Sequence, residues 1–395
     1  MSSKRKPKRK VSSEHHSPDK SILIFMIGMA IFGAIMIYDA SVYKANQPPF
    51  NNQFYFLTLQ VGWLLFGGIL GFFAYLIDYR KILKFSFPIL IGVIILLVLV
   101  LLVGQEVNGS KRWFQVGSLP QIQPAEFAKL AIIMYFASWF SNKEYSFSKF
   151  EDSFKKGFLK NLLPFVAILG IVALLILFEP DLGTAMIICL TAFIMFFVSG
   201  KDTAHRIGSL AVIPLAFVLG VVAIALEPYR MQRLQTFLNL IFKGEVADPR
   251  GSGYQMQQIL IGIGSGGFWG KGFGQSRQRF GYLVENTAFT DSTFAVLLEE
   301  LGLWGGALVV LSWVFFLWRG FKIALSAADK QGQFLATGIT VWLACQAFLN
   351  MAANVGLIPL TGIPLPFLTY GGSSTIVTMI AFGLLLNVSK YTKNA

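Results

Sequence analysis

The sequence is poor in charged residues and has little cysteine or histidine. Charged residues make up 13% of the 395 positions, whereas soluble domains average about 25%. The two cysteines, Cys189 and Cys345, both lie in apolar stretches, so we interpret them as small core residues rather than as a disulfide or a metal-binding pair. The three histidines, His15, His16 and His205, lie outside the segments discussed below. Any general base must therefore come from another residue type.

Apolar residues make up 55% of the chain and are concentrated in blocks. The blocks are roughly 18 to 25 residues long, the length that crosses the hydrocarbon core of a bilayer. They are too many to be covered by one soluble core. The sequence therefore predicts an all-α, polytopic integral membrane protein with about ten transmembrane helices. The predicted spans are 21–38, 54–77, 85–103, 124–141, 162–178, 182–199, 207–226, 291–317, 332–353 and 369–389.

The formal charge of +13 is explained by membrane topology rather than by nucleic acid, because basic residues collect in cytoplasmic loops. With the N-terminus inside, the inner segments hold 22 lysines and arginines, and the short outer loops hold only Lys44, Lys111 and Arg112. Both termini are therefore predicted to be cytoplasmic. The cluster Lys4–Lys10 is interpreted as a topogenic, lipid-facing segment, and a specific partner site there is the alternative.

The predicted organisation has three parts: a basic cytoplasmic tail (1–20), a ten-helix membrane domain (21–389) and a cytoplasmic C-terminus (390–395). A large outer loop, 227–290, joins spans seven and eight. Its glycines are interleaved with apolar residues such as Ile259 and Phe273, so we expect short interfacial or re-entrant helices rather than a flexible linker. A phosphate-binding P-loop is not predicted, because no Gly-Lys-Ser/Thr follows at the required spacing.

Ionisable residues at membrane depth are costly to bury and are functional candidates for that reason. Glu126 and Lys129 lie near the outer start of span four, three residues apart and hence on one helix face. They either line a polar cavity or neutralise one another to permit insertion. Asp291 opens span eight, where a helix cap is the alternative to a catalytic role. Glu299 and Glu300, two turns deeper, are expected to pair within the bundle.

Other polar residues gather on the predicted outer face. Lys111 and Arg112 either anchor the chain at the interface or bind a lipid phosphate, and Asp181 follows Pro180 at the start of span six as a candidate cap. Further positive charge suits an anionic lipid-linked substrate better than a cation. It is supplied on the same face by Arg230, Arg233, Arg250, Lys271, Arg277 and Arg279. A Pro- and Gly-rich segment, 356–372, interrupts the chain before span ten, as happens where backbone lines a cavity or packs in protein.

Several motifs, in this order along the chain, resemble the SEDS family of peptidoglycan polymerases. They cover residues 108–374, and each is weak alone while the set is specific. They are Asn108-Gly-Ser-Lys-Arg-Trp113, Gln123-Pro-Ala-Glu-Phe-Ala-Lys129, Pro180-Asp-Leu-Gly-Thr184, Gly253-Tyr-Gln255, Ile263-Gly-Ser-Gly-Gly267, Gly272-Phe-Gly-Gln-Ser-Arg-Gln278, Glu299-Glu-Leu-Gly302 and Gly362-Ile-Pro-Leu-Pro-Phe-Leu-Thr-Tyr-Gly-Gly-Ser-Ser374. The segment 272–278 is more similar to the division branch, FtsW, than to the elongation branch, RodA.

The resemblance implies a SEDS fold with its large extracellular loop, in the bacterial cytoplasmic membrane. It implies glycosyl transfer on lipid II at the outer face, with a class B penicillin-binding transpeptidase and other divisome proteins as partners. The family's proposed catalytic aspartate lies in a segment like Leu-Pro-Glu-x-His-Thr-Asp-Phe. Residues 283–292 align Thr290-Asp291 and Glu285 with it, but Val284 replaces the proline, two extra residues intervene, and Phe289 and Ser292 replace the histidine and phenylalanine. Glu179 stands where the family usually has glutamine.

Asp291 is therefore the predicted general base, since a sugar hydroxyl is a poor nucleophile and no outer histidine is present. Charge stabilisation of the leaving diphosphate is expected from basic residues or from a divalent cation, Mg²⁺ or Mn²⁺, although no ligand cluster has a diagnostic spacing. The competing hypotheses are a lipid II flippase, a RodA-like elongation polymerase and a structural scaffold. The predicted substrate-binding residues are Lys111, Arg112, Glu126, Lys129, Asp181, Gln275, Ser276, Arg277, Arg279 and Glu285.

Overall fold

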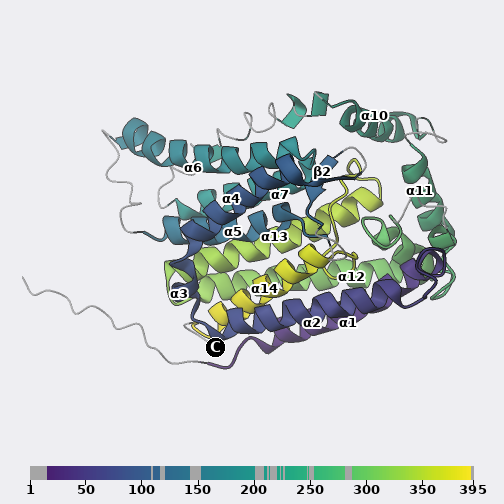
Figure 1. Ribbon diagram of the computed structural model, residues 1–395, viewed down its shortest axis with the longest axis horizontal. Coiled ribbons are helices and arrows are strands. Elements are labelled where there is room, and N and C mark those ends of the chain that lie inside the picture. Colours follow the sequence, from purple (N-terminus) through teal and green to yellow (C-terminus); the bar gives the residue numbers. More distant parts are fainter. Residues whose placement is uncertain are drawn as a thin grey trace, which may run out of the picture.

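The computed structural model is a bundle of long helices that run side by side (Figure 1). It describes residues 16–107, 110–115, 121–142, 153–200, 227–246, 253–280 and 287–392, with single residues between 209 and 225 and at 248. The main helices are α1 (Lys20–Ala45), α2 (Tyr55–Leu76), α4 (Ser86–Val103), α5 (Pro124–Phe140), α6 (Ser153–Phe178), α7 (Leu182–Ser199), α12 (Thr293–Ser326), α13 (Lys330–Asn354) and α14 (Gly372–Ser389). Shorter elements are α3 (Tyr79–Leu83), α10 (Pro228–Lys243), α11 (Tyr254–Gly266), η1 (Gln278–Phe280) and the hairpin of β1 (Gln105–Val107) with β2 (Ser110–Trp113).

These helices confirm an all-α, multi-pass membrane architecture. In the described part of the chain, seven helices are long and apolar enough to cross a bilayer. With α5 and α6 added, nine of the ten predicted spans coincide with helices. The tenth, 207–226, lies mainly outside the described residues. Three helices extend well past their predicted spans. α1 runs on to Ala45 and α12 to Ser326, and α6 begins at Ser153, because hydropathy marks only the part of a helix that lies in lipid.

Two helices form the centre of the bundle. The most apolar window of α13 is 83% buried and that of α14 is 78% buried, whereas the values for α2 and α4 are 22% and 28%. The outer helices expose large apolar side chains such as Leu65 and Val103. Lipid tails are as apolar as a protein core, so such exposure costs little in a membrane. The polar residues of α13 are therefore enclosed by the fold.

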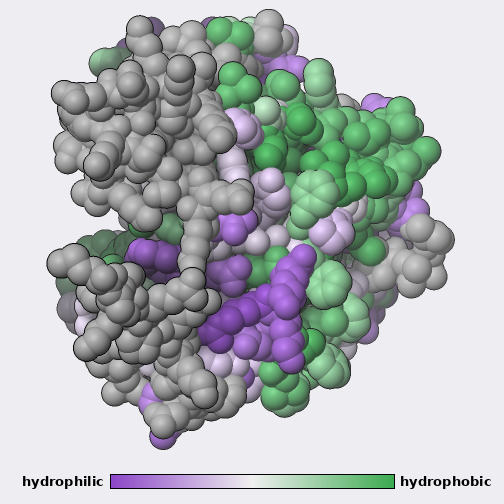
Figure 2. All heavy atoms as spheres, turned by 90° about the vertical axis from the view of Figure 1, so that its left-hand side faces the viewer, coloured by the Kyte–Doolittle hydropathy of each residue, from purple (hydrophilic) through white to green (hydrophobic). Residues whose placement is uncertain are grey.

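The first and last described residues lie at one end of the bundle, which we call the terminal end. The backbone N–H of Asp19 donates to Ser389 Oγ at 3.0 Å, and Arg319 Nε on α12 donates to Asp19 Oδ2 at 2.7 Å. Termini on one side agree with an even number of spans. Figure 2 faces this end and shows hydrophilic side chains gathered near its centre, with hydrophobic ones covering the flank at the upper right.

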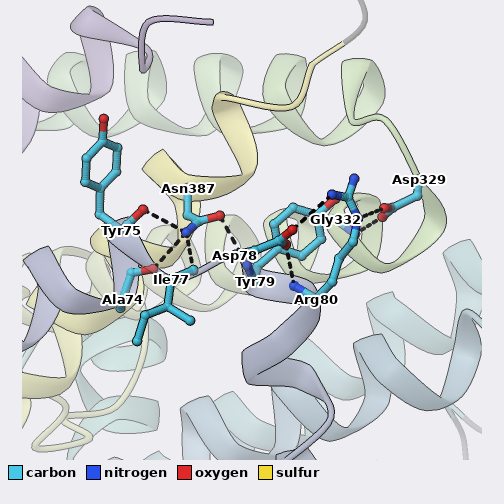
Figure 3. Close-up of polar contacts among 9 residues, drawn as sticks. All are labelled: Ala74, Tyr75, Ile77, Asp78, Tyr79, Arg80, Asp329, Gly332 and Asn387. Atoms are coloured by element: carbon cyan, nitrogen blue, oxygen red, sulfur yellow. Dashed lines mark hydrogen bonds and ion pairs between the residues drawn. The ribbon is translucent and has the colours of Figure 1, made fainter. Parts of the chain in front are cut away.

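A polar cluster closes the turn between α2 and α3 at the terminal end (Figure 3). Asn387 of α14 donates its Nδ2 to three carbonyls at the end of α2 and just after it, those of Ala74, Tyr75 and Ile77. The last carbonyls of a helix lack partners within it, so the asparagine satisfies them. Arg80 pairs with Asp329 beside it, Nε to Oδ2 at 2.5 Å.

The opposite end carries the hairpin and the described parts of the loop 227–290, and we call it the loop end. The glycine-rich segment of this loop packs against the first turns of α12, where the helix is kinked at Gly302. Gly302 has φ +66°, and a Cβ there would collide with the backbone of Phe268 and Gly270. Glycine at 302 therefore lets the loop approach α12 closely. The expected short helices are present as α10 and α11, and α11 crosses the loop end in Figure 1.

Candidate active site

Asp291 lies at the loop end, two residues before α12 begins. The N-cap position is occupied by Ser292 rather than Asp291, and no side chain caps this helix. The alternative of Asp291 as a helix cap is therefore wrong. Its side chain is partly exposed, and Oδ1 accepts a hydrogen bond from the Thr290 hydroxyl at 3.0 Å. A carboxylate in this place is accessible to a substrate that approaches from the loop end.

The backbone around Asp291 is held by the segment that precedes α14. The N–H of Tyr370 donates to the carbonyl of Phe289 at 2.8 Å, and the Thr369 hydroxyl donates to the carbonyl of Thr290 at 2.7 Å. The Pro- and Gly-rich segment is thus packed in protein, as its composition predicts, and it binds the two residues that precede the candidate base.

Glu126 and Lys129 form the predicted pair on one face of α5. Lys129 Nζ lies 2.8 Å from Glu126 Oε1, and the two side chains are 1% and 3% exposed. Lys129 also donates to Gln346 Oε1 on α13 at 2.9 Å. Gln346 in turn donates to the carbonyl of Pro364 at 3.0 Å. The buried pair is therefore linked by hydrogen bonds to the same segment that binds the carbonyls of Phe289 and Thr290, next to Asp291.

Arg112 and Asp181 meet at the turn between α6 and α7. Arg112, on β2, donates Nε to the carbonyl of Glu179 at 2.6 Å and Nη2 to that of Pro180 at 2.7 Å. Asp181 caps α7 by accepting the N–H of Thr184 at 2.9 Å, which confirms its interpretation as a cap. Lys111 is exposed. Arg112 therefore binds the main chain of this turn, and Lys111 projects to the surface beside it.

Glu179 is the most unusual group in this turn. Its side chain is fully buried, and neither carboxylate oxygen has a hydrogen-bond partner. Burial, helped by the neighbouring charge of Asp181, raises the pKa of Glu179 to about 8, although Arg112 opposes the shift. The carboxyl is thus mostly protonated in the folded protein at neutral pH, which makes it chemically similar to the glutamine that the family resemblance leads us to expect at this position.

The raised pKa of Glu179 predicts a stability that falls with rising pH. Between about pH 4.5 and pH 8 the folded chain keeps a proton that the unfolded chain releases, so the free energy of unfolding decreases by at most about 1.4 kcal/mol per pH unit. Glu179→Gln removes this slope. We expect the variant to melt at a higher temperature than wild type at pH 8.5 and at a similar one at pH 5. Glu245→Gln, at an exposed position of the loop, is the control, and an equal slope in all three proteins would contradict the assignment.

The glycine-rich motif is anchored on two glutamates of α12. Ser276 donates its hydroxyl to Glu299 Oε2 at 2.6 Å and its N–H to Glu300 Oε1 at 3.0 Å. Lys271 Nζ lies 2.6 Å from Glu299 Oε1. The expectation that Glu299 and Glu300 pair within the bundle is confirmed only for Glu300, which interacts with Asp39 of α1. The loop descends to both glutamates, and it supplies the partners of Glu299.

The remaining predicted residues of this loop divide into bound and exposed ones. Arg279 forms an ion pair with Asp39 of α1 and also donates to the carbonyl of Gly274. Gln275 and Arg277 are exposed. Glu285 lies outside the described residues. Of the loop's candidates, Ser276 and Arg279 thus fix the loop, while Gln275 and Arg277 face solvent at the loop end.

The structure adds residues that the sequence reasoning missed. Gln346, Asn350 and Asn354 lie on one face of α13 and are at most 2% exposed. Asn350 and Asn354 both donate Nδ2 to the carbonyl of Asp291 at 2.9 Å. The available signal was three amide side chains at a spacing of four in an apolar helix. In the described part of the chain, no group of three or more His, Cys, Asp or Glu residues is arranged to hold a metal ion.

Comparison with known proteins places these features in a family. The sequence model described as "Cell cycle protein", for FtsW, RodA and SpoVE, matches residues 19–394. Stage V sporulation protein E of Bacillus subtilis (strain 168) is 40% identical over 385 residues, 97% of this chain and 100% of that protein. The probable peptidoglycan glycosyltransferase FtsW of Nitrosomonas europaea is 39% identical over 375 residues, 93% of this chain and 91% of that protein.

A solved structure agrees with this grouping. A chain from a peptidoglycan synthase complex, described as coordinating polymerization and crosslinking, superimposes with a TM-score of 0.74. The two chains are 26% identical, and the match covers 96% of this chain and 99% of the other. This chain belongs to the FtsW, RodA and SpoVE family of cell cycle proteins.

Proposed function

We propose that this protein is a peptidoglycan glycosyltransferase that polymerises lipid II into glycan strands at the outer face of the bacterial cytoplasmic membrane. The observation that carries the proposal is Asp291, a partly exposed carboxylate at the loop end whose backbone carbonyl is bound by α13. The segment before α14 binds the neighbouring carbonyl of Thr290. A relative that is 39% identical bears the name of this activity. The proposed orientation has both termini in the cytoplasm, and it is supported by the basic residues of the inner segments, since such residues collect in cytoplasmic loops.

In the proposed reaction Asp291 acts as general base. Its carboxylate accepts the proton of the acceptor sugar's 4-hydroxyl, and that oxygen forms a bond to the anomeric carbon of the donor. The bond from this carbon to the diphosphate breaks with inversion, and undecaprenyl diphosphate leaves with the electron pair. Negative charge develops on the diphosphate, and positive side chains at the loop end stabilise it. Lys111, Arg112 and Arg277 are the proposed groups.

The other candidate residues have supporting roles in this proposal. Glu126 and Lys129 shape the interior behind Asp291 through Gln346. Asp181 holds the turn to which Arg112 is bound, and Ser276 and Arg279 hold the glycine-rich loop in place. Gln275 and Glu285 are proposed to contact the substrate from the loop. A divalent cation bound with the diphosphate would supply further positive charge.

The proposed partner is a class B penicillin-binding transpeptidase within the divisome. The related synthase complex couples polymerization to crosslinking, and a glycan strand needs crosslinking to become part of a wall. Division is the proposed setting, because the segment 272–278 is similar to the division branch and relatives named FtsW are 35–39% identical. The 40% identity to a sporulation protein makes wall synthesis during sporulation the second candidate, with the same chemistry.

The direct test is an assay of the purified protein in detergent with lipid II, with and without a candidate transpeptidase. We expect glycan polymer to form, and to form faster with the partner. A flippase moves lipid between two sides of a membrane, and detergent-solubilised protein has no two sides. Polymer in detergent therefore excludes transport as the sole function. A folded, partner-bound protein that makes no polymer while moving labelled lipid II across vesicles would overturn the proposal.

A further inference from the structure

The buried face of α13 carries three amide side chains in an otherwise apolar environment. Gln346, Asn350 and Asn354 are four residues apart, and each is at most 2% exposed. A buried amide is costly unless its donors and acceptor are paired. All three donate to backbone carbonyls outside their own helix, and these carbonyls belong to residues 291, 363 and 364. The face therefore binds two irregular segments at once.

The carbonyl of Asp291 depends on these amides. The α12 hydrogen bonds begin at the carbonyl of Ser292, which accepts the N–H groups of Ala295 and Val296. The Asp291 carbonyl lies just outside this ladder. It instead accepts Asn350 Nδ2 and Asn354 Nδ2, each at 2.9 Å. A backbone carbonyl left unpaired inside protein loses about as much free energy as a broken hydrogen bond.

The amides also hold one another and the neighbouring segment. Asn354 Nδ2 donates to the carbonyl of Asn350 at 3.0 Å, and Asn350 Nδ2 donates to the carbonyl of Ile363 at 2.7 Å. From the other side, the Thr369 hydroxyl accepts the N–H of Leu365 and donates to the carbonyl of Thr290. Residues 289–291 thus have all three carbonyls bound, while the Asp291 carboxyl is held only by Thr290 within its own segment.

We propose that Asn350 and Asn354 are positioning residues that fix the backbone of Asp291 so that its carboxyl meets the acceptor hydroxyl in a reactive geometry. The inference rests on the proposed function of Asp291. A displacement of about 1 Å at a reacting group can cost on the order of 100-fold in rate. Loss of these amides is therefore expected to lower kcat while leaving KM, which reflects the rest of the lipid site, nearly unchanged.

The test uses Asn350→Leu, Asn354→Leu and the milder Thr369→Val, which removes one hydroxyl. We expect kcat for lipid II polymerisation to fall by about 10- to 100-fold in the asparagine variants and less in Thr369→Val, with KM within about twofold of wild type. Thr369→Val keeps the test valid if either asparagine variant fails to fold.

The matched control is Asn387→Leu at the terminal end. Asn387 also donates Nδ2 to backbone carbonyls, but these belong to Ala74, Tyr75 and Ile77 (Figure 3). Its loss is expected to lower the melting temperature while kcat per folded molecule stays close to wild type. An equal fall of kcat in this control would overturn the positioning role, because it would show that any buried asparagine has this effect.

Asp291→Asn, assayed in parallel, separates the two hypotheses. If Asp291→Asn polymerises like wild type, the assignment of the base fails, and the positioning role fails with it. If Asp291→Asn is inactive while the asparagine and Thr369→Val variants keep a wild-type kcat, the base assignment stands and only the positioning role is wrong.

Discussion

Asp291→Asn is expected to lower the rate of lipid II polymerisation by at least about 100-fold. General bases contribute roughly 10²- to 10⁴-fold to enzymatic rates, and an amide cannot accept the proton of the acceptor hydroxyl at neutral pH. The fold should be preserved, because Asn350 and Asn354 bind the backbone carbonyl of this residue and not its side chain. Purified, partner-bound variant would be assayed for polymer length and yield, together with its melting temperature.

The control for this prediction is Glu245→Gln, which removes an exposed carboxylate from the same loop. It is expected to polymerise at a rate close to wild type. Wild-type polymer from well-folded Asp291→Asn would show that another group takes the proton. A scaffold without enzymatic activity would give the same result, and the activity of the wild-type protein without its partner then distinguishes the two.

Lys129→Met is expected to destabilise the protein more than any surface replacement. It leaves the carboxylate of Glu126 buried with its cation removed, and Gln346 Oε1 loses one of its two donors while keeping Trp342 Nε1. Breaking a buried ion pair on one side typically costs about 3–5 kcal/mol, whereas replacing both partners by apolar residues is often close to neutral. We therefore expect a large drop in melting temperature for Lys129→Met and a partial recovery for the double variant Glu126→Leu with Lys129→Met.

Lys81→Met is the matched control, since Lys81 is exposed on the short helix α3. Its melting temperature should stay within about one degree of wild type, in line with the small effect of most surface replacements. A Lys129→Met variant as stable as Lys81→Met would mean that Glu126 takes up a proton or another partner at little cost. A double variant less stable than Lys129→Met alone would contradict the idea that the uncompensated charge is what destabilises.

Features that depend on residues close together in the sequence were predicted correctly. The apolar blocks predicted the positions of nine helices to within a few residues, for the parts that lie in the membrane. The spacing of Glu126 and Lys129 predicted their pairing, and the position of Asp181 predicted its cap. Each of these follows from helix geometry over one or two turns, and neighbours in sequence are then neighbours in space.

Hydrogen bonds between residues that lie far apart in the sequence were not predicted. Glu299 and Glu300 were expected to pair within the bundle, and Glu300 does interact with Asp39 of α1. Both also bind a loop that precedes them by about 25 residues, and Gly302 permits its close approach. Asp291 was interpreted either as a cap or as a base. The structure gives the cap position to Ser292, and the carbonyl of Asp291 is bound by Asn350 of α13.

The sequence by itself determined the membrane class, the main spans, the shared side of the two termini and the choice of Asp291 as the candidate base. Hydropathy, charge and motif order are written along the chain, so no contact between distant residues was needed. Only the tertiary structure decided how Asp291 is held, because the amides that bind its carbonyl lie about 60 residues further on, on α13. Hydrogen bonds between irregular segments leave no periodic pattern in the sequence, so they become visible only when the helices are packed.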